Sequence, residues 1–336
     1  MTKVFAIDHG NGAVKMRTDV FKKTLPSIYS FASNVGEALS GGKMKLKTYK
    51  VDGAEYVWGD DIIKVSNTLN TYAQQNRYKT NQYKTLSKIA LAEMAIKTNV
   101  KGYDEVLVVT GVPSQEIGTK AVDEIKEVYQ GTHEVEVNGK KVTINVVDVI
   151  VLAQPVGTVM SRYLDEDGFV SDDSYEDMTV GIIDIGTGTT DLDVVSMLRR
   201  EKESTSVPKG MHDVYEPIVS KIKKETSASI NDYKLEKVFE IGEYQASKRM
   251  DPINFNDEKT ASIKEVYDFI VNGVNNAWKT FDRFDEVLVS GGGANTFHEL
   301  LEEWIGKVTK LEESQTANVE GFYRYGKFEV GEEDGE

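Results

Sequence analysis

The sequence predicts an α/β protein built from two similar halves. Short apolar segments alternate along the chain with longer stretches in which apolar residues recur every three or four positions. This alternation of strands and helices is typical of α/β folds. Each half also contains the pattern Ile-Asp-x-Gly-x-Gly directly after an apolar segment, at residues 7–12 and 183–188. The repeated pattern indicates duplicated halves that face each other.

Length and composition set the class of protein. At 336 residues, the chain is long for one core, so two domains are expected. The formal net charge of −15 argues against direct binding to nucleic acid or to anionic membranes. The absence of cysteine excludes disulfides, thiolate catalysis and cysteine-ligated zinc. No apolar segment approaches the ~18 residues of a transmembrane helix, and the N-terminus does not resemble a signal peptide. We therefore expect a cytoplasmic protein with no membrane association.

The first half is expected to open with a buried strand and its hairpin partner. From about residue 33 to 81 the chain becomes polar and contains glycine, which indicates a small inserted subdomain. In chain order we then expect these elements: strands at 4–7 and 14–21, a hairpin turning at Asp52-Gly53, a helix over 82–98, a strand over 105–113, a helix around 122–128, a hairpin turning at Asn138-Gly139, and a helix from Ala153 toward Leu164.

The acidic stretch 165–177 is interpreted as the boundary between the domains. Domain I is expected to comprise 1–178 and about 311–330, and domain II to comprise 179–310 with a small subdomain at about 211–284. The elements predicted for the second half are strands at 178–186 and 189–197, helices at 212–224, 233–242 and 261–281, a strand that begins at 286, and a helix over 295–305. The last residues, 331–336, are expected to be disordered.

The glycines of the two repeated bends suggest a phosphate-binding site. A glycine-rich bend leaves backbone N–H groups uncovered, and such groups bind phosphate oxygens. Gly10 and Gly12 supply one bend, and Gly186 and Gly188 supply the other. Lys15 adds a positive charge beside the first. One such bend alone is more often an ordinary hairpin turn, but the pair favours a clamp that binds a polyphosphate from both sides.

The two aspartates of these bends suggest that a cation binds with the phosphates. Asp8 and Asp184 would be repelled by phosphate, so their expected role is to hold Mg²⁺ directly or through its water shell. A third glycine segment, Gly291 to Gly293, joins a predicted strand to a predicted helix. It is either a tight turn or a flat surface on which a nucleoside lies near a helix N-terminus. Neither bend fits the GxxxxGK[ST] pattern of P-loop proteins.

Four segments together resemble the actin/Hsp70/sugar-kinase superfamily. AIDHGNGAVK (6–15) resembles its first phosphate loop, IIDIGTGTTDLD (182–193) the second, VLVSGGGAN (287–295) the adenosine motif, and LAQPVGTVMSRYL (152–164) the helix that links the lobes. The order and spacing match from residue 4 to about 310. The opening motif, the Leu-Pro-Ser that follows it and the compact size look like bacterial ParM-type plasmid-segregation actins. The resemblance implies an actin-like two-lobed fold, with duplicated ribonuclease-H-like mixed sheets flanking a nucleotide cleft.

The resemblance also implies roles for individual residues. Asp8 and Asp184 would organise Mg²⁺, and Gln154 would position the hydrolytic water with assistance from Asp184. Hydrolysis of this kind needs in-line placement and charge neutralisation more than covalent chemistry. The nucleotide itself would be bound by Gly10, Asn11, Gly12, Lys15, Gly186, Thr187, Gly188, Thr189, Gly210, Gly291, Gly292, Gly293 and Asn295.

The function implied by the resemblance is an actin-like ATPase. ATP or ADP would bind with Mg²⁺, and the sequence leaves GTP open as an alternative. The protein would polymerise head to tail into nucleotide-dependent filaments and move plasmid DNA apart through a centromere-binding adaptor protein, so that its contact with DNA is indirect. A small-molecule kinase of the same superfamily is the alternative. A chaperone-like regulator is a third, although the chain has no room for a peptide-binding domain.

A few other polar residues have two interpretations. His9 lies in the first bend, but its side chain is expected to point away from the phosphates. Asp191 and Asp193 have the spacing of a metal-binding pair, yet solvent-facing or packing carboxylates are the favoured interpretation, because they alternate along a strand. A basic strip, Lys43, Lys45, Lys47 and Lys50, is either solvated surface or a contact to the next identical subunit.

Overall fold

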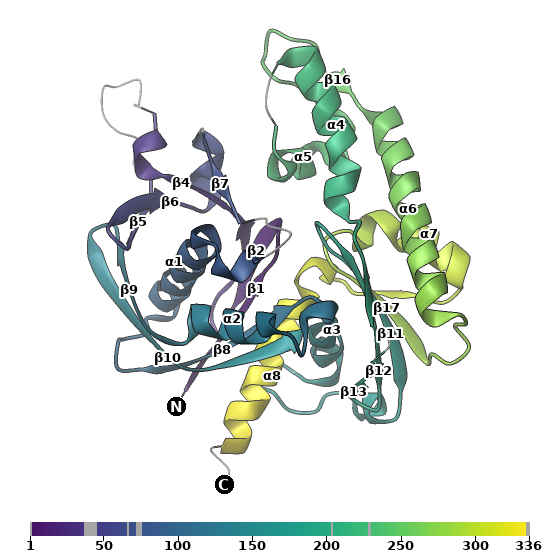
Figure 1. Ribbon diagram of the computed structural model, residues 1–336, viewed down its shortest axis with the longest axis horizontal. Coiled ribbons are helices and arrows are strands. Elements are labelled where there is room, and N and C mark those ends of the chain that lie inside the picture. Colours follow the sequence, from purple (N-terminus) through teal and green to yellow (C-terminus); the bar gives the residue numbers. More distant parts are fainter. Residues whose placement is uncertain are drawn as a thin grey trace. The chain divides into compact units, whose positions relative to one another are not determined.

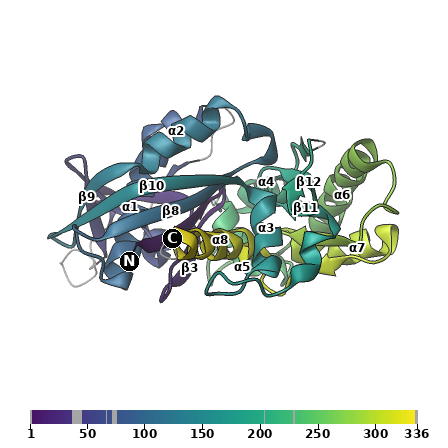
Figure 2. The same ribbon diagram turned by 90° about the horizontal axis from the view of Figure 1, so that it is seen from below.

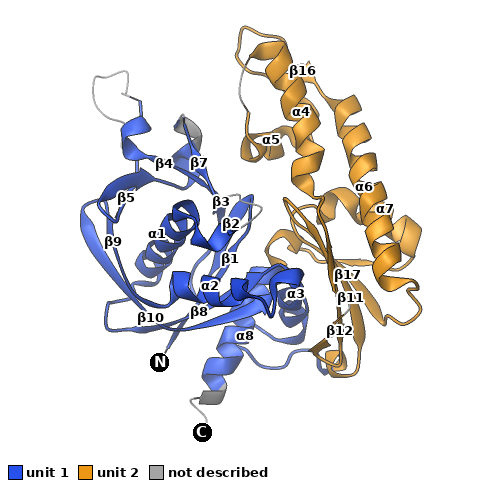
Figure 3. Cartoon of the chain, in the orientation of Figure 1, with its two compact units in different colours: residues 1–173, 318–336 blue, residues 174–317 orange. Residues whose placement is uncertain are grey.

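The computed structural model describes residues 2–36, 46–65, 67–71, 76–202, 204–227 and 230–333. Lys43 and Lys45 of the basic strip lie outside these residues. The chain divides into two compact units, one of residues 1–173 with 318–336 and one of residues 174–317 (Figure 3). Each unit contains a β-sheet with helices packed on it (Figure 1). The predicted α/β class is therefore confirmed.

Unit 1 is built on a mixed sheet with ten strands among the described residues, in the order β3-β2-β1-β8-β10-β9-β5-β6-β4-β7. The central strands β1, β8 and β10 are parallel, and the hairpin partners on both sides are antiparallel. The strands are β1 (Lys3–His9), β2 (Ala13–Arg17), β3 (Lys22–Pro26), β4 (Ile28–Phe31), β5 (Thr48–Val51), β6 (Ala54–Val57), β7 (Leu69–Asn70), β8 (Glu105–Val112), β9 (Gly131–Val137) and β10 (Lys140–Ala153).

Both predicted two-residue hairpin turns are confirmed. Asp52 and Gly53 join β5 to β6 with φ values of 48° and 86°, and Asn138 and Gly139 join β9 to β10 with φ values of 47° and 78°. Two successive positive φ values twist the chain in the direction that matches the flanking strands, and Asn, Asp and Gly tolerate them best.

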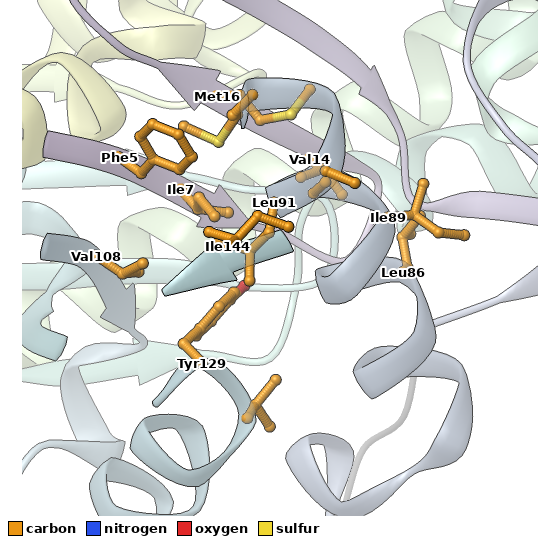
Figure 4. Close-up of a cluster of buried hydrophobic side chains, with 14 of the residues drawn as sticks. Phe5, Ile7, Val14, Met16, Leu86, Ile89, Leu91, Val108, Tyr129 and Ile144 are labelled. Atoms are coloured by element: carbon orange, nitrogen blue, oxygen red, sulfur yellow. The ribbon is translucent and has the colours of Figure 1, made fainter. Parts of the chain in front are cut away.

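The two faces of the unit 1 sheet bury alternate residues of the same strands. Phe5 and Ile7 of β1 pack with α1 (Asn81–Thr98) and α2 (Lys120–Tyr129) in the cluster of Figure 4. Val4 and Ala6 pack on the opposite face against α8 (Ala317–Glu333), and Figure 2 shows α2 and α8 on opposite sides of the sheet. A central parallel strand that is covered on both faces has apolar residues at successive positions. This is why Val4 to Ile7 of β1 are all apolar.

Helix α8 closes unit 1 and was not predicted from the sequence. It runs through Glu333, so the expected disorder from residue 331 is wrong for 331–333. The helix packs against α3 (Gln154–Tyr163) at a point where both helices carry glycine. A Cβ atom on Gly321 would lie 1.7 Å from the carbonyl oxygen of Gly157. The two backbones can approach this closely because neither residue has a side chain.

Unit 2 contains a sheet in the order β13-β12-β11-β17-β18, with β14 also paired to β12. As in unit 1, the strand before the glycine bend, β11, is antiparallel to the next strand and parallel to a later one. The strands are β11 (Thr179–Ile185), β12 (Thr190–Ser196), β13 (Arg199–Arg200), β14 (Thr205–Val207), β17 (Glu286–Ser290) and β18 (Thr309–Lys310). A separate pair consists of β15 (Glu243–Tyr244) and β16 (Ile253–Asn254).

The helices of unit 2 are α4 (Met211–Thr226), α5 (Asp232–Phe239), α6 (Asn256–Trp278) and α7 (Ala294–Ile305). Helix α6 begins before its predicted start at Ala261, and it buries Val266, Ile270 and Val274, which recur every four residues along one side. Short 3₁₀ helices complete the described chain: η1 (Ala32–Asn34), η2 (Asp60–Lys64), η3 (Arg77–Lys79), η4 (Ser114–Glu116), η5 (Asp173–Glu176) and η6 (Ser314–Thr316). Among the described residues, no helix is long and apolar enough to cross a membrane.

The glycine contact between α3 and α8 gives a stability prediction. Gly321→Ala should lower the free energy of unfolding by about 3 kcal/mol, because the added methyl group meets a backbone carbonyl that cannot move without separating the helices. Urea unfolding followed by circular dichroism measures the change. Gly331→Ala in the same helix is the control: its Cβ would have open space, so stability should stay the same or rise by up to about 1 kcal/mol. Equal effects of the two substitutions would contradict the packing argument.

Candidate functional site

The first bend brings together three residues that the sequence analysis assigned to one site. Asp8 is the penultimate residue of β1 and pairs across the hairpin with Lys15 of β2. The Lys15 Nζ atom donates to Asp8 Oδ2 at 2.7 Å, and Gln154 Nε2 donates to Asp8 Oδ1 at 2.8 Å. Only 1% of Asp8 is exposed. A carboxylate buried to this degree is costly unless it is paired and hydrogen-bonded, and Lys15 and Gln154 meet both requirements.

Gln154 reaches Asp8 because a strand passes directly into a helix. Strand β10 ends at Ala153 and α3 begins at Gln154, with Pro155 in the first turn. Proline is well tolerated there because the first N–H groups of a helix have no partner within it. Since β10 runs parallel to β8, and β8 to β1, the C-terminal ends of these strands lie at the same edge of the sheet. Residues far apart in sequence are thereby placed beside one another.

The second bend has the same local geometry as the first. In the first bend, a Cβ atom on Gly10 would lie 3.0 Å from the carbonyl oxygen of Ala13. A Cβ on Gly186 would lie 3.1 Å from the carbonyl oxygen of Thr189, also three residues further on. The Gly186 N–H closes this turn by donating to Thr189 O at 2.8 Å. Both bends are therefore tight turns in which the side chain of another residue would crowd the backbone.

The charges opposite the two aspartates differ. Asp184 pairs across the β11–β12 hairpin with Asp191, which takes the place that Lys15 has opposite Asp8. Both carboxylates are buried, with 7% of Asp184 and 3% of Asp191 exposed. The second hairpin therefore has two carboxylates at the position where the first has an ion pair.

The donor set at Asp184 fits Mg²⁺ if a ligand supplies further oxygens. Within the described part of the chain, no group of three or more His, Asp or Glu side chains could hold a metal ion alone. Mg²⁺ is usually bound by one or two carboxylates together with water and substrate phosphates. One or two buried aspartates at a glycine bend meet that requirement without an all-protein cage.

The second bend is supported by the N-terminus of α4. The backbone N–H groups of Met211 and His212 donate to the carbonyl oxygens of Gly186 and Thr187, at 3.0 and 2.7 Å. Gly210 precedes the helix, and a Cβ atom there would lie 2.6 Å from Gly186 O. The predicted Gly210 therefore lies directly against the second bend, and no larger residue fits between the two backbones.

The third glycine segment lies against the same bend. Gly291 has a φ of +86°, and a Cβ atom on it would lie 2.4 Å from Asp184 Oδ1. The Gly293 N–H donates at 2.9 Å to the carbonyl oxygen of Ile185, the residue after Asp184. This hydrogen bond holds the third glycine segment beside Asp184. Gly292 is exposed, and the exposed Asn295 accepts a hydrogen bond from Lys310 Nζ at 3.1 Å. Of the four predicted residues, Gly291 and Gly293 are the two in direct contact with the second bend.

Three other polar residues take structural positions. The His9 ring points into the unit 1 core, where it stacks on Tyr83 with ring centroids 4.0 Å apart, and burial lowers its pKa. Asp193 is buried and pairs with Arg200 at 2.7 Å. The solvent-facing alternative for Asp191 and Asp193 is therefore wrong, because both are buried.

Two contacts to the first bend were not found from the sequence. Ser27 Oγ donates to Gly10 O at 2.6 Å, and Arg77 Nη2 donates to His9 O at 2.6 Å. Ser27 belongs to the Leu-Pro-Ser segment that carried part of the family resemblance, so a signal was present for it. Arg77 is one of many basic residues, and no pattern in the sequence distinguishes it.

Comparisons with known proteins agree with this architecture. A family model for the N-terminal domain of actin-like proteins matches residues 6–157, and a model for the MreB-like C-terminal domain of archaeal actin homologues matches residues 182–303. No curated protein matches the sequence. The chain belongs to the actin-like superfamily and has its two-domain α/β fold.

Solved structures that resemble the chain over nearly its whole length include ParM proteins. The apo ParM protein of psk41 is 25% identical, with 99% of each chain covered and a TM-score of 0.75. A ParM from a 15-stranded filament of Clostridium botulinum is 18% identical, with 97% of this chain and 99% of that chain covered and a TM-score of 0.76. The archaeal actin homologue Ta0583, in a complex with ADP, is 17% identical, with 97% and 99% covered and a TM-score of 0.72.

A histidine beside the second bend gives a pH prediction. His212 Nδ1 lies 2.7 Å from Asp232 Oδ2, and this hydrogen bond raises the pKa of His212 above 6.5. The pair should stabilise the fold fully below the unfolded-state pKa, and that contribution should be lost as the pH rises through the higher folded-state pKa. NMR titration of the imidazole protons should show His212 titrating above 6.5 in the native protein and lower in Asp232→Asn.

His133 is the internal control for this titration. Burial lowers its pKa below 6.5, so it should titrate at lower pH than His212 and should not respond to Asp232→Asn. A His212 pKa at or below that of His133 would contradict the assignment.

Proposed function

We propose that the chain is an actin-like nucleotide hydrolase that assembles head to tail into filaments in the presence of ATP, or GTP, and Mg²⁺. The single observation that carries this proposal is the repetition of one bend, with the same local geometry and a buried aspartate, in both units. Asp8 and Asp184 are both buried and precede Gly10 and Gly186, and a Cβ atom on each glycine would lie about the same distance, 3.0 and 3.1 Å, from the carbonyl oxygen three residues further on. An ordinary hairpin turn gives no reason for a buried acid at the same position twice.

The uncovered amides of both bends would bind the phosphates of one nucleotide. Thr187, Gly188 and Thr189 would contribute from the second bend, and Gly10, Asn11 and Gly12 from the first. Lys15 supplies a positive charge at the edge of the first bend, where it now neutralises Asp8. The Gly291–Gly293 turn would carry the nucleoside.

Gln154 is suited to positioning the attacking water. Its Nε2 atom donates to Asp8, which fixes the side-chain amide and leaves the Oε1 atom available as an acceptor for a water proton. Asp8 and Asp184 would hold Mg²⁺, and Asp191 adds negative charge opposite Asp184. When bound, the ion would neutralise charge on the phosphates. Holding water and phosphate in line contributes most to this kind of hydrolysis.

Filament assembly is supported by the kinds of protein that share the fold. A ParM filament from Clostridium botulinum and a non-polymerisable quadruple mutant of pCBH ParM are among the similar structures. A head-to-tail contact that does not close on itself extends by repetition. We further propose that the filament moves plasmid DNA through a basic adaptor protein, because a net charge of −15 disfavours direct DNA contact. The proposed domains remain 1–178 with 311–330, and 179–310.

Assembly gives the most direct test. Light scattering of the purified protein should rise on addition of ATP and Mg²⁺ above a threshold protein concentration, and electron microscopy should show filaments. ADP with Mg²⁺ at the same concentration is the control and should give a smaller signal. Scattering that stays at the baseline at all concentrations with both ATP and GTP would rule out the filament. ADP release stimulated by sugars or short-chain acids would instead favour the small-molecule kinase.

Hydrolysis tests the site residues separately from assembly. Gln154→Ala should bind ATP but release phosphate about a hundredfold more slowly, because the attacking water loses its acceptor. Asp184→Ala should also bind ATP and release phosphate more slowly. Gln130→Ala is the matched control, because the Gln130 amide donates to Val147 O on the surface of the same unit. Phosphate release by Gln154→Ala at the rate of the control would contradict the assigned role.

A further inference from the structure

The carbonyl groups of the first bend are held by side chains from other parts of unit 1. Arg77 Nη2 donates to the carbonyl oxygen of His9, and Ser27 Oγ donates to that of Gly10, each at 2.6 Å. The Ser27 N–H donates to Gly12 O at 3.0 Å. Ser27 is completely buried, so no water competes for its hydroxyl group. Three of the bend's carbonyl groups are therefore fixed by two residues.

Fixing a carbonyl group also fixes the next N–H group. The peptide bonds of the described residues are trans, and in a planar trans peptide the C=O of one residue and the N–H of the next point in opposite directions. The bond from Arg77 to His9 O therefore sets the direction of the Gly10 N–H. The bond from Ser27 to Gly10 O sets that of the Asn11 N–H. Both N–H groups must point away from the side chains that hold the carbonyls.

Arg77 is itself held in place by its surroundings. Its guanidinium carbon lies 4.9 Å from the centroid of the Tyr83 ring, and Tyr83 stacks on the His9 ring. The two residues that follow Arg77 in η3 are anchored too: the Tyr78 hydroxyl donates to Glu116, and Lys79 Nζ lies 2.7 Å from Glu124. A charged donor fixed in this way makes a stronger hydrogen bond than a neutral one. It also polarises the peptide group, which makes the following N–H a better donor.

The second bend obtains the same support in a different way. There, two backbone N–H groups at the start of α4, those of Met211 and His212, bind the carbonyls of Gly186 and Thr187. Backbone donors cannot be removed by replacing a side chain. The first bend relies on side chains instead, so its support can be removed one hydrogen bond at a time.

We infer that Arg77 and Ser27 are positioning residues that aim the amides of Gly10 and Asn11 at a nucleotide phosphate. The inference rests on the proposed nucleotide-binding function and adds two residues that act through the backbone. Arg77 lies on η3, in the last part of the inserted segment 33–81, so this segment contacts the first bend through the hydrogen bond from Arg77 to His9 O.

The test is a comparison of ligands with and without phosphate. Arg77→Met keeps the length of the side chain and removes the donor, and Ser27→Ala removes only the hydroxyl group. Calorimetric titration in excess Mg²⁺ should show that each variant binds ATP about tenfold more weakly than the native protein. Adenosine, which has no phosphate, should bind each variant as it binds the native protein. Arg77→Lys should recover part of the affinity for ATP.

Two matched controls separate positioning from general loss of stability. Ser30→Ala removes a hydroxyl group that is equally buried but donates to Asn67 O at 3.0 Å, away from the bend. Lys79→Met removes a cation from the same 3₁₀ helix as Arg77, one that pairs with Glu124. Both controls should bind ATP with native affinity. If Arg77→Met does not fold, the Ser27→Ala and Ser30→Ala pair decides the question.

Three results would overturn the inference, and they are distinguishable. If the native protein binds neither ATP nor GTP in excess Mg²⁺, the proposed function fails and the inference fails with it. If the native protein binds ATP and folded Ser27→Ala and Arg77→Met bind it equally well, the inference alone fails. A parallel loss of affinity for ATP and adenosine also overturns it, because positioning of phosphate-binding amides cannot weaken a ligand without phosphate.

Discussion

The arrangement of unit 1 depends on a carboxylate that is buried at the end of a central strand. Asp8 has only 1% of its surface exposed, so its charge must be balanced within the protein. Lys15 provides the balancing charge from the adjacent strand, and Gln154 provides a second hydrogen bond from the start of α3. Removing a buried ion's partner generally costs much more than the pair contributes in net stability. The strand, the hairpin and the helix start are therefore tied to one another through this side chain.

The two units hold their glycine bends in place with different residues. Each holds a glycine bend at the end of a central strand, and each keeps the carbonyls of that bend occupied. Unit 1 uses a cation opposite its aspartate and side chains behind its bend, whereas unit 2 uses a second aspartate and a helix N-terminus. The residue opposite the aspartate is therefore a cation in unit 1 and a second carboxylate in unit 2.

Glycine is needed in this chain mainly where two backbones meet. Gly210 allows the start of α4 to lie on the second bend, and Gly291 allows the third glycine segment to lie beside Asp184. Gly157 and Gly321 allow α3 and α8 to cross in contact. The same helix start, at Gln154, therefore depends on a glycine contact with α8, a helix from the other end of the chain. The position of Gln154 in the candidate site therefore depends on how α3 packs against α8.

Local features of this protein followed from the sequence because their causes are local. The hairpin turns at Asp52-Gly53 and Asn138-Gly139 were predicted from their tolerance of positive φ, and the two bends from the spacing of aspartate and glycine. Helix α6 was predicted from the sequence, although its start was placed too late. The pattern of residues 317–333 did not indicate a helix, because α8 presents no strongly amphipathic face and its glycines are explained only by a partner helix.

Contacts between distant segments were decided by the tertiary structure alone. The sequence indicated that Asp8 and Gln154 act together only through a family resemblance, and the parallel order of β1, β8 and β10 is what places their side chains 2.8 Å apart. The roles of Arg77 and Ser27 could not be predicted from residue type, since a hydrogen bond to a backbone carbonyl leaves no pattern in the sequence. The sequence by itself determined the turns, the two acid-bearing bends and the class of fold, because these depend on neighbouring residues. The partners of each bend were decided by the fold, because they depend on which strand ends and helix ends meet.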